Sequence, residues 1–288
     1  MGKAVEVLIT AGLGNQMFQY ALGRSLSLRL QRPLVLDISL LSLEPEWGFD
    51  LRHFRLGRQQ VRNWHLLPWK VRRKLLRMLT AQGVEVTRWV DEGGQQFSPE
   101  TLAIHQPCVL NGYWQSERYF DSISDELREE FTIVTAQDAQ SAECQARMRR
   151  VKYVGLHVRR GDYVTNPVTN AYHGVCSRDY YDAALHMILS RMGEDADLYV
   201  FSDDIEWCRA NVRYPLPTTY VDWNQERSYE DLRLMSSCSA LAMANSSFSW
   251  WAGWLNPNPD KLIVAPQRWF QAPGAVSDLP NSRWLIAL

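Results

Sequence analysis

The chain has 288 residues, which is enough for one large domain or two of ordinary size. A formal net charge of −1 gives no sign of a protein that binds nucleic acid or another polyanion. The five cysteines are widely spaced with no CxxC pair, which argues against a disulfide framework and favours a reducing compartment. Because the chain shows neither a leader pattern nor an apolar run of membrane-spanning length, we expect a cytoplasmic protein.

The chain begins with a strand pattern over 5–10, a turn that contains Gly12 and Gly14, and a helical pattern from Phe18 onward. Strand, glycine-rich turn and helix together are typical of the opening βα unit of a doubly wound fold. Free N–H groups at such a helix start favour anions or hydroxyl oxygens, so Gly14 is a candidate for ligand contact. The alternative interpretation is that the glycines only make a tight turn, since the turn matches neither GxGxxG nor a P-loop.

A basic stretch follows at 55–78, with a helix expected over 70–79 and no acid among its cations. Two interpretations fit this stretch. A basic amphipathic helix with tryptophans is typical of peripheral contact with an anionic membrane, here at the inner face. A solvated helix that packs its leucine face on the domain gives the same pattern. The cations are Arg55, Arg58, Arg62, Lys70, Arg72, Arg73, Lys74 and Arg77.

The second half alternates strand and helix patterns, which indicates βαβ units and a parallel sheet. We place the domain boundary at 148/149, giving domains 1–148 and 149–288. A loop is expected at 164–174, and Ser228–Asp231 has the pattern of a capping box that opens a helix. The expected strands are 153–156, 198–201, 218–221, 240–244 and 262–265.

Polar side chains follow three of these strands, and the carboxyl ends of parallel strands share one edge of the sheet. Arginine and a helix N-terminus both suit phosphate, and a carboxylate can accept from the N–H groups of guanine. The pattern therefore predicts a nucleotide-diphosphate site without a metal. Of Asp203 and Asp204, one is expected to contact a ligand and the other to cap a helix. The three groups are His157 with Arg159 and Arg160; Asp203 with Asp204; and Asn245 with Ser246 and Ser247.

Four ordered motifs, at 12–20, 157–163, 201–204 and 244–251, resemble those of α-1,2-fucosyltransferases of glycosyltransferase family 11. The resemblance spans nearly the whole chain. It implies an α/β, GT-B-like fold with two Rossmann-like domains whose parallel sheets face a central cleft, the first on the acceptor side and the second binding GDP-fucose. It further implies inverting, metal-free transfer of L-fucose from GDP-β-L-fucose to the 2-hydroxyl of a galactose-terminated glycan.

The resemblance also implies roles for individual residues. Arg159 would hold the β-phosphate, His157 and Asp203 would meet the guanine and ribose, and Arg160 would be structural. The serine-containing helix mouth would form the second phosphate clamp through Ser246 or Ser247, and Asn245 just before it is a further candidate for nucleotide contact.

The general base stays open at this point. The α-1,6 relatives carry a glutamate shortly after the paired arginines, where this chain has Thr165-Asn166-Pro167. Asp162 and His173 are the two candidates, but Asp162 also fits a structural bond to Arg160 or the turn, and His173 fits an ordinary loop histidine.

In the first domain, Asn15 with Gln16 is expected to orient the acceptor hydroxyl or the fucose. The alternatives to a galactoside acceptor are another sugar position, protein O-fucosylation, and a non-catalytic protein that binds nucleotide sugars.

Overall fold

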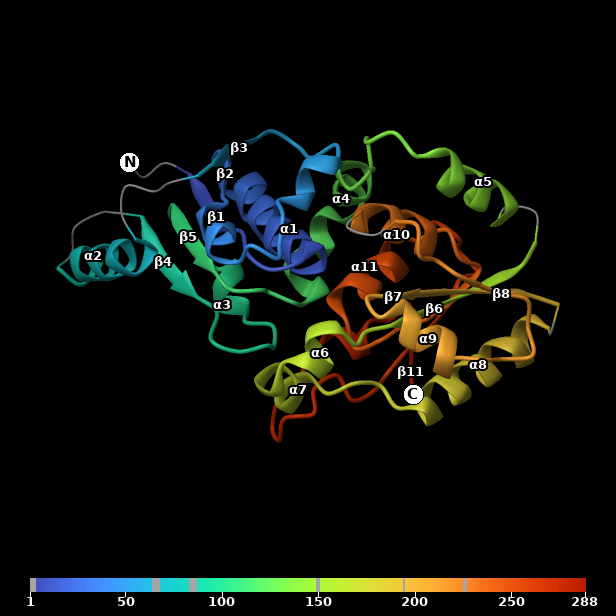
Figure 1. The fold of residues 1–288 in the computed structure, drawn as a ribbon. Helices are drawn as coiled ribbons and strands as arrows, with labels where there is room; N and C mark the ends of the chain where they lie inside the picture. Colours follow the sequence, from blue (N-terminus) through green and yellow to red (C-terminus); the bar gives the residue numbers. More distant parts are fainter. Residues whose placement is uncertain (1–3, 64–67, 83–86, 149–150, 194, 225–226) are drawn as a thin grey trace. The chain divides into compact units, whose positions relative to one another are not determined.

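The computed structural model describes residues 4–63, 68–82, 87–148, 151–193, 195–224 and 227–288 (Figure 1). They form two compact units, Met1–Val134 and Thr135–Leu288. Each unit consists of a parallel sheet with helices, which confirms the expected α/β class.

The division between the units lies before α5 (Ala139–Met148), whereas the sequence analysis placed it after this helix. Helix α5 packs on α10 (Ser228–Met235) of the second unit. Ahead of it, Asp138 pairs with Arg227 at 2.7 Å, and Ser141 of α5 donates to Asn224 at 3.0 Å. Helix α5 is polar, and these non-local bonds assign it to the second unit.

The sheet of the first unit has five parallel strands among the described residues. Val5, Val7 and Leu8 are almost fully buried, as a strand covered on both faces requires. Helix α1 (Leu13–Leu30) packs on the first two strands and ends at Gln31, which adopts the left-handed conformation at φ 52°. The order is β3 (Gln59–Arg62), β2 (Leu34–Asp37), β1 (Val5–Leu8), β5 (Cys108–Asn111) and β4 (Arg88–Asp91).

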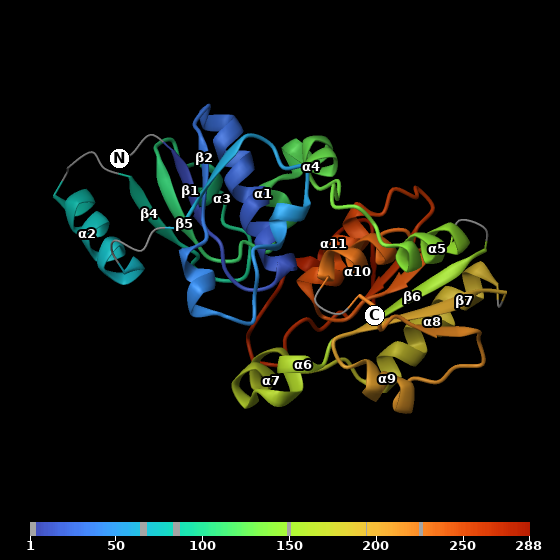
Figure 2. The ribbon, with the colours of Figure 1, turned by 45° about the horizontal axis from the view of Figure 1, so that its top comes forward.

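Helix α2 (Trp69–Ala81) lies beside β4, as both ribbon views show (Figures 1 and 2). The helix expected over 70–79 is therefore confirmed. The sequence also predicts a strand over 84–90, of which 84–86 lie outside the described residues and 88–90 lie in β4. Within the ranges given above, no helix has both the length and the apolar character that a membrane crossing requires. The remaining elements of this unit are η1 (Ser39–Leu43), η2 (Asp50–His53), α3 (Pro99–Leu102), η3 (Glu117–Tyr119), η4 (Asp121–Ile123) and α4 (Ser124–Glu130).

The sheet of the second unit has six parallel strands in the described part of the chain. Its order reverses between β6 and β9, as in a doubly wound nucleotide-binding fold. Helix α8 (Arg178–Met192) buries Tyr181, Ala184, Leu185 and Ile188 in the core of this unit. The strand order is β11 (Ile286–Ala287), β10 (Leu262–Ala265), β9 (Ala240–Ala242), β6 (Tyr153–Val158), β7 (Asp197–Ser202) and β8 (Thr218–Tyr220).

The segment expected as a loop at 164–174 is helical for most of its length, so this prediction was wrong. It contains the end of α6 (Gly161–Thr165) and all of α7 (Pro167–His173). Asn166 caps α7 by accepting from the N–H groups of Val168 and Thr169. Pro167 suits the first helical position, and Gly174 ends the helix at φ 65°. The Asn-Pro pair was the local signal for this helix.

Candidate functional site

The carboxyl ends of β6 and β9 flank the point where the strand order of the second unit reverses. Ligands of open α/β sheets bind at such a point. His157 lies near the end of β6, and α11 (Ser247–Leu255) begins shortly after β9. The ring of His157 lies 5.8 Å from that of Phe248 in α11. The structure therefore brings the residues after β6 and the residues after β9 together, as predicted. Asp203, directly after β7, lies beside them.

Arg159 lies between two carboxylates. Its Nη1 atom is 2.7 Å from Oδ2 of Asp203, and its Nη2 atom pairs with Asp162. The structural alternative for Asp162 was a bond to Arg160 or the turn, whereas its partner in the structure is Arg159. Gly161 permits this arrangement, because a Cβ atom at this position would lie 2.4 Å from the Asp203 carboxylate. The two acids hold the guanidinium at the edge of the sheet, with the side chain 21% exposed.

The two neighbouring aspartates have separate roles. Oδ1 of Asp203 accepts from the backbone N–H of Arg160 at 2.8 Å, so both its oxygens serve the Arg159-Arg160 segment. Asp204 caps α9 (Ile205–Asn211) by accepting from Trp207, as expected for one of the pair. Asp204 also pairs with Arg160, whose guanidinium lies 3.8 Å from the Trp207 ring. Arg160 is accordingly a structural residue, whereas the nucleoside contact predicted for Asp203 stays a prediction.

The imidazole of His157 is almost fully buried, and its Nδ1 atom has no hydrogen-bond partner among the described residues. Burial lowers the pKa of His157 to about 4; the Asp203 carboxylate opposes this shift and the Arg159 cation adds to it. The ring is therefore neutral at neutral pH. A buried ring nitrogen without a protein partner, placed at a strand switch point, is a candidate for ligand contact.

Ser246 and Ser247 form the mouth of α11. Ser246 is the N-cap, and its Oγ atom accepts from the N–H of Phe248 at 3.3 Å, which leaves its hydroxyl proton to donate. Ser247 is the first helical residue and is half-buried. The first turn of α11 carries no acid, so nothing on the helix itself neutralises the positive end of its dipole. This mouth suits an anion.

Asn245 lies at the same edge, but its side chain is occupied inside the protein. Its amide nitrogen donates to the carbonyl oxygens of His173 at 3.0 Å, Gly174 at 3.4 Å and Trp269 at 3.1 Å. Its Oδ1 atom accepts from the thiol of Cys176. These bonds fix the end of α7 and the chain after β10. The geometry gives Asn245 a positioning role, and the predicted ligand contact is not supported by a free polar atom.

Replacing Asn245 with alanine should lower the free energy of unfolding by about 2–4 kcal/mol, because three buried carbonyl groups lose their donor. Urea denaturation at neutral pH measures this change. Asn211→Ala, which removes a single bond from an exposed side chain to the carbonyl of Trp207, is the matched control and should cost far less. Equal losses in the two variants would contradict the role given to Asn245.

His173 belongs to an aromatic group. Its ring stacks on Tyr163 with centroids 4.6 Å apart and planes at 15°, and it also contacts Tyr172 and Phe270. Burial lowers the pKa of His173, and Nδ1 is buried without a hydrogen-bond partner in the described structure. The packing fits the structural interpretation of this residue. Its role as a base stays a prediction.

The candidates of the first unit lie at the start of α1, next to the switch point between β1 and β5. Oδ1 of Asn15 accepts from Gln115, which follows β5, at 2.6 Å, and Gly14 is buried beside it. Gln16 is fully buried and donates to the carbonyl groups of Ala11 and Gly48, so it holds the loop rather than an acceptor. The ligand roles of Gly14 and Asn15 stay predictions.

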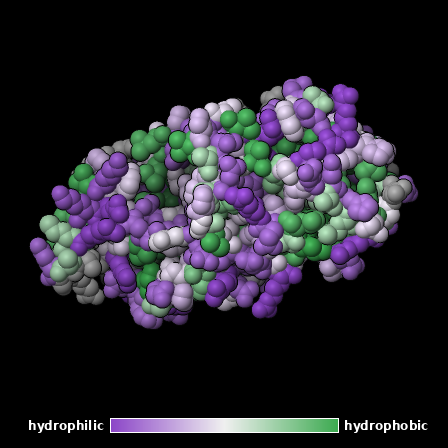
Figure 3. All heavy atoms as spheres, turned by 90° about the horizontal axis from the view of Figure 1, so that it is seen from below, coloured by the Kyte–Doolittle hydropathy of each residue, from purple (hydrophilic) through white to green (hydrophobic). Residues whose placement is uncertain are grey.

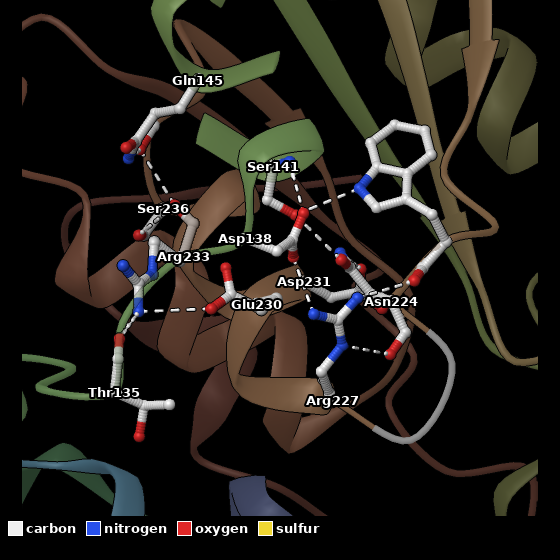
Figure 4. Close-up of polar contacts among 12 residues, drawn as sticks. Thr135, Asp138, Ser141, Gln145, Asn224, Arg227, Glu230, Asp231, Arg233 and Ser236 are labelled. Carbon is white, nitrogen blue, oxygen red and sulfur yellow. Dashed lines mark hydrogen bonds and ion pairs between the residues drawn. The ribbon is translucent and has the colours of Figure 1, made fainter. Parts of the chain in front are cut away.

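A group of polar residues around α10 was not predicted from the sequence (Figure 4). Because α10 leads back into β9, its first turn lies at the carboxyl edge of the sheet. Asn224 donates to Asp231 at 2.6 Å, and burial raises the pKa of Asp231 to about 7. Glu230 beside it is also buried, and burial raises the pKa of its carboxyl. Carboxyl groups with shifted pKa values at the ligand-binding edge of a sheet are candidates for a functional role.

The sequence predicts a capping box at Ser228–Asp231. Helix α10 begins at Ser228 itself, and the side chain of its N-cap residue Arg227 makes no capping bond. Two acids at a helix start after a short strand were the available signal for this part of the site.

Comparison with known proteins gives the family. The model of "Glycosyl transferase family 11" matches residues 4–284. The Escherichia coli O-antigen biosynthesis glycosyltransferase WbnK is 31% identical over 300 residues, covering 96% of this chain and 98% of that protein. An Escherichia coli alpha-1,2-colitosyltransferase is 30% identical over 278 residues, covering 93% and 92%. The Homo sapiens galactoside alpha-(1,2)-fucosyltransferase 1 is 30% identical over 169 residues, covering 55% of this chain and 46% of that protein.

Among solved structures, Arabidopsis thaliana FUT1 in complex with GDP superposes with a TM-score of 0.52 at 12% identity, covering 93% of this chain and 72% of that one. At this identity the similarity concerns the fold alone, which is GT-B-like. The family match spans nearly all of the sequence, including the motifs at the ends of β6, β7 and β9. The chain therefore belongs to glycosyltransferase family 11.

Proposed function

We propose that this glycosyltransferase moves L-fucose from GDP-β-L-fucose to the 2-hydroxyl of a terminal galactoside in a glycan, with inversion and without a metal. The observation that carries the proposal is the clamp at the switch point of the second unit. There, Arg159 is held by Asp162 and Asp203. Its guanidinium lies 5.2 Å from the ring of Tyr163, whose hydroxyl donates to the carbonyl of Asn245 shortly before the acid-free N-terminus of α11. The alpha-1,2-colitosyltransferase and the galactoside alpha-(1,2)-fucosyltransferase among its relatives support α-1,2 linkage and a galactoside acceptor.

The clamp suits a leaving diphosphate. In a single displacement at the anomeric carbon, the bond to the phosphate oxygen breaks and the GDP gathers negative charge. The Arg159 guanidinium, the Ser246 hydroxyl and the N–H groups at the start of α11 would bind that charge. Contacts that strengthen as charge develops accelerate the reaction more than contacts to the ground state.

For the nucleoside, we propose that His157 and Asp231 replace the expected pair of His157 and Asp203. Asp203 already accepts from the Arg160 backbone and pairs with Arg159. Guanine offers N–H donors on its N1 and N2 atoms, which need a carboxylate acceptor. Asp231 accepts one bond from Asn224 and has acceptor capacity left at the same edge of the sheet.

The base is the least determined part of the mechanism. Asp162 shares the Arg159 guanidinium that would bind phosphate, so a bound diphosphate would compete with it and leave a carboxylate inside the site. His173 is packed among aromatic rings, and its lowered pKa makes it a weaker base. We therefore favour Asp162. The turnover numbers of Asp162→Asn and His173→Ala separate the two candidates, and a large loss in His173→Ala alone would reverse the choice.

Transfer from GDP-fucose should survive EDTA, because Arg159 and the α11 terminus would supply the positive charge that a metal provides elsewhere. The measurement is product formation on a panel of β-galactosides with and without chelator, with the new anomeric configuration read by NMR. Loss of transfer on chelation, restored by Mg²⁺ or Mn²⁺, would contradict the metal-free clamp. A β-linked product would contradict inversion.

One relative supports a second donor. The alpha-1,2-colitosyltransferase matches 93% of this chain at 30% identity, whereas the human fucosyltransferase matches 55% at the same identity. Colitose is L-fucose without its 3-hydroxyl group. Competition between GDP-fucose and GDP-colitose at equal concentrations gives the ratio of kcat/KM for the two donors. A ratio that favours GDP-colitose would replace fucose in the proposal. GDP binding without transfer to any acceptor would instead favour the non-catalytic alternative.

A further inference from the structure

Helix α2 of the first unit has two different faces. One face packs on the sheet: Trp69 and Leu76 contact the small core cluster of Leu8, Trp89 and Val109. This is the leucine face that the solvated-helix interpretation expected. The sheet covers only this side, and the opposite side of α2 is open to solvent.

Ion pairs anchor the packed side of α2. Arg72 reaches across the sheet to Glu6, at 2.7 Å, and to Asp37, at 3.4 Å. Arg73 and Arg77 both pair with Asp91, at 3.0 and 2.7 Å. Much of the positive charge that suggested a membrane contact in the sequence is therefore neutralised inside the unit and gives no support to a docking surface.

The solvent-facing side of α2 carries an unusual combination. Val71, Leu75 and Met78 are 51%, 42% and 48% exposed and share one helix face by their spacing of four and three residues. Lys70 and Lys74 lie along the side of this apolar stripe, exposed and without an ion-pair partner among the described carboxylates. The helix contains no acid. Figure 3 shows purple and pale-green side chains next to each other at the end that carries α2.

We propose that this face of α2 docks on an anionic lipid surface, with Val71, Leu75 and Met78 entering the headgroup boundary and Lys70 and Lys74 meeting lipid phosphates. The charge complementarity of an acid-free helix selects an anionic partner. The stripe consists of three side chains, so its apolar area is far below the roughly 800 Å² per partner that a specific protein interface buries. Lysines whose stems lie along apolar side chains and whose ammonium groups reach headgroups are typical of interfacial helices.

The docking should be weak and salt-sensitive. Each surface cation strengthens binding to an anionic leaflet by about fivefold, and the attraction falls off within a Debye length. Three aliphatic side chains add a modest apolar contribution. The contact would place this glycosyltransferase at a membrane surface. It does not depend on which nucleotide sugar the second unit binds.

Co-sedimentation of the full chain with vesicles tests the proposal. With phosphatidylglycerol in phosphatidylcholine the protein should pellet at low salt and be released at high salt, and pure phosphatidylcholine should retain little. The affinity of the double variant K70E with K74E for the anionic vesicles should fall by more than about tenfold. The control R191E with R213E makes the same charge change at exposed positions of the second unit and should bind like the original chain.

A third variant isolates the apolar part. L75S with M78S should weaken vesicle binding and keep its salt dependence, because the cations remain. Equal binding by all variants, or none to anionic vesicles, would overturn the proposal. A dimer that forms without lipid and disappears in L75S with M78S would also overturn it, by showing that the face binds a second copy. Transfer to a soluble acceptor, assayed in parallel, tests the proposed function separately, since these substitutions lie in α2.

Discussion

Replacing Arg159 with alanine should lower kcat/KM for transfer by about a thousandfold, the scale of losing a principal donor to a developing negative charge. Arg159 is held between Asp162 and Asp203, next to the mouth of α11. Loss of the guanidinium removes charge stabilisation and leaves the two carboxylates unneutralised at the phosphate position. Steady-state kinetics with GDP-fucose and a β-galactoside measure the change, and the Kd of GDP should rise in parallel.

Two variants control this experiment. Arg159→Lys keeps the charge but not the planar fork, so it should recover only part of the activity. Arg178→Ala removes an exposed arginine of the same unit that pairs with Asp182, and it should leave kcat/KM almost unchanged. Activity in Arg159→Ala within tenfold of the original would show that the clamp lies elsewhere.

Replacing Asp231 with asparagine should raise the free energy of unfolding by about 4 kcal/mol at pH 7 and by little near pH 4. Burial raises the pKa of Asp231 from its ordinary value of 3.8 to about 7. Below pH 3.8 the carboxyl is protonated in both the folded and the unfolded state, so its ionisation does not lower the free energy of unfolding. Between 3.8 and 7 the unfolded state ionises first, so the original chain loses stability with rising pH and the asparagine variant does not.

The same variant should bind GDP less tightly, because asparagine cannot accept from two N–H groups of guanine as a carboxylate does. Greater stability with weaker GDP binding is the outcome that separates a ligand carboxylate from a structural one. Urea denaturation from pH 4 to 7 and calorimetric titration with GDP give the two measurements. A variant that binds GDP unchanged would remove Asp231 from the proposed site.

Asp138→Asn is the matched control for the pH experiment. Asp138 lies in the same polar group and accepts from the backbone N–H of Ser141, which together with Arg227 holds its pKa below the usual value. A lowered folded pKa contributes stability above the unfolded pKa and loses it as the pH falls. Asp138→Asn should therefore be less stable than the original at pH 7, opposite in sign to Asp231→Asn. The same sign in both would contradict the burial argument.

Local patterns predicted much of the fold. Buried parallel strands are continuous apolar runs, so Tyr153–Leu156 and Leu262–Ala265 were visible in the sequence, as was the helix after the first glycine-rich turn. The predictions of the fold were wrong where the composition of a whole segment was given more weight than a short local signal inside it. Asn166 and Pro167 start a helix in a segment whose composition suggested a loop, and α10 begins at Ser228 itself.

By itself, the sequence determined the α/β class, the strand ends that carry His157, Arg159 and Ser246, and the family resemblance, because all of these depend on residues close together in the chain. Only the tertiary structure decided which partners those residues take. Asp162 pairs with Arg159 rather than Arg160, and Asn245 binds three backbone carbonyls. Ion pairs and buried hydrogen bonds depend on side-chain direction and on segments far apart in sequence, which periodicity and spacing do not encode.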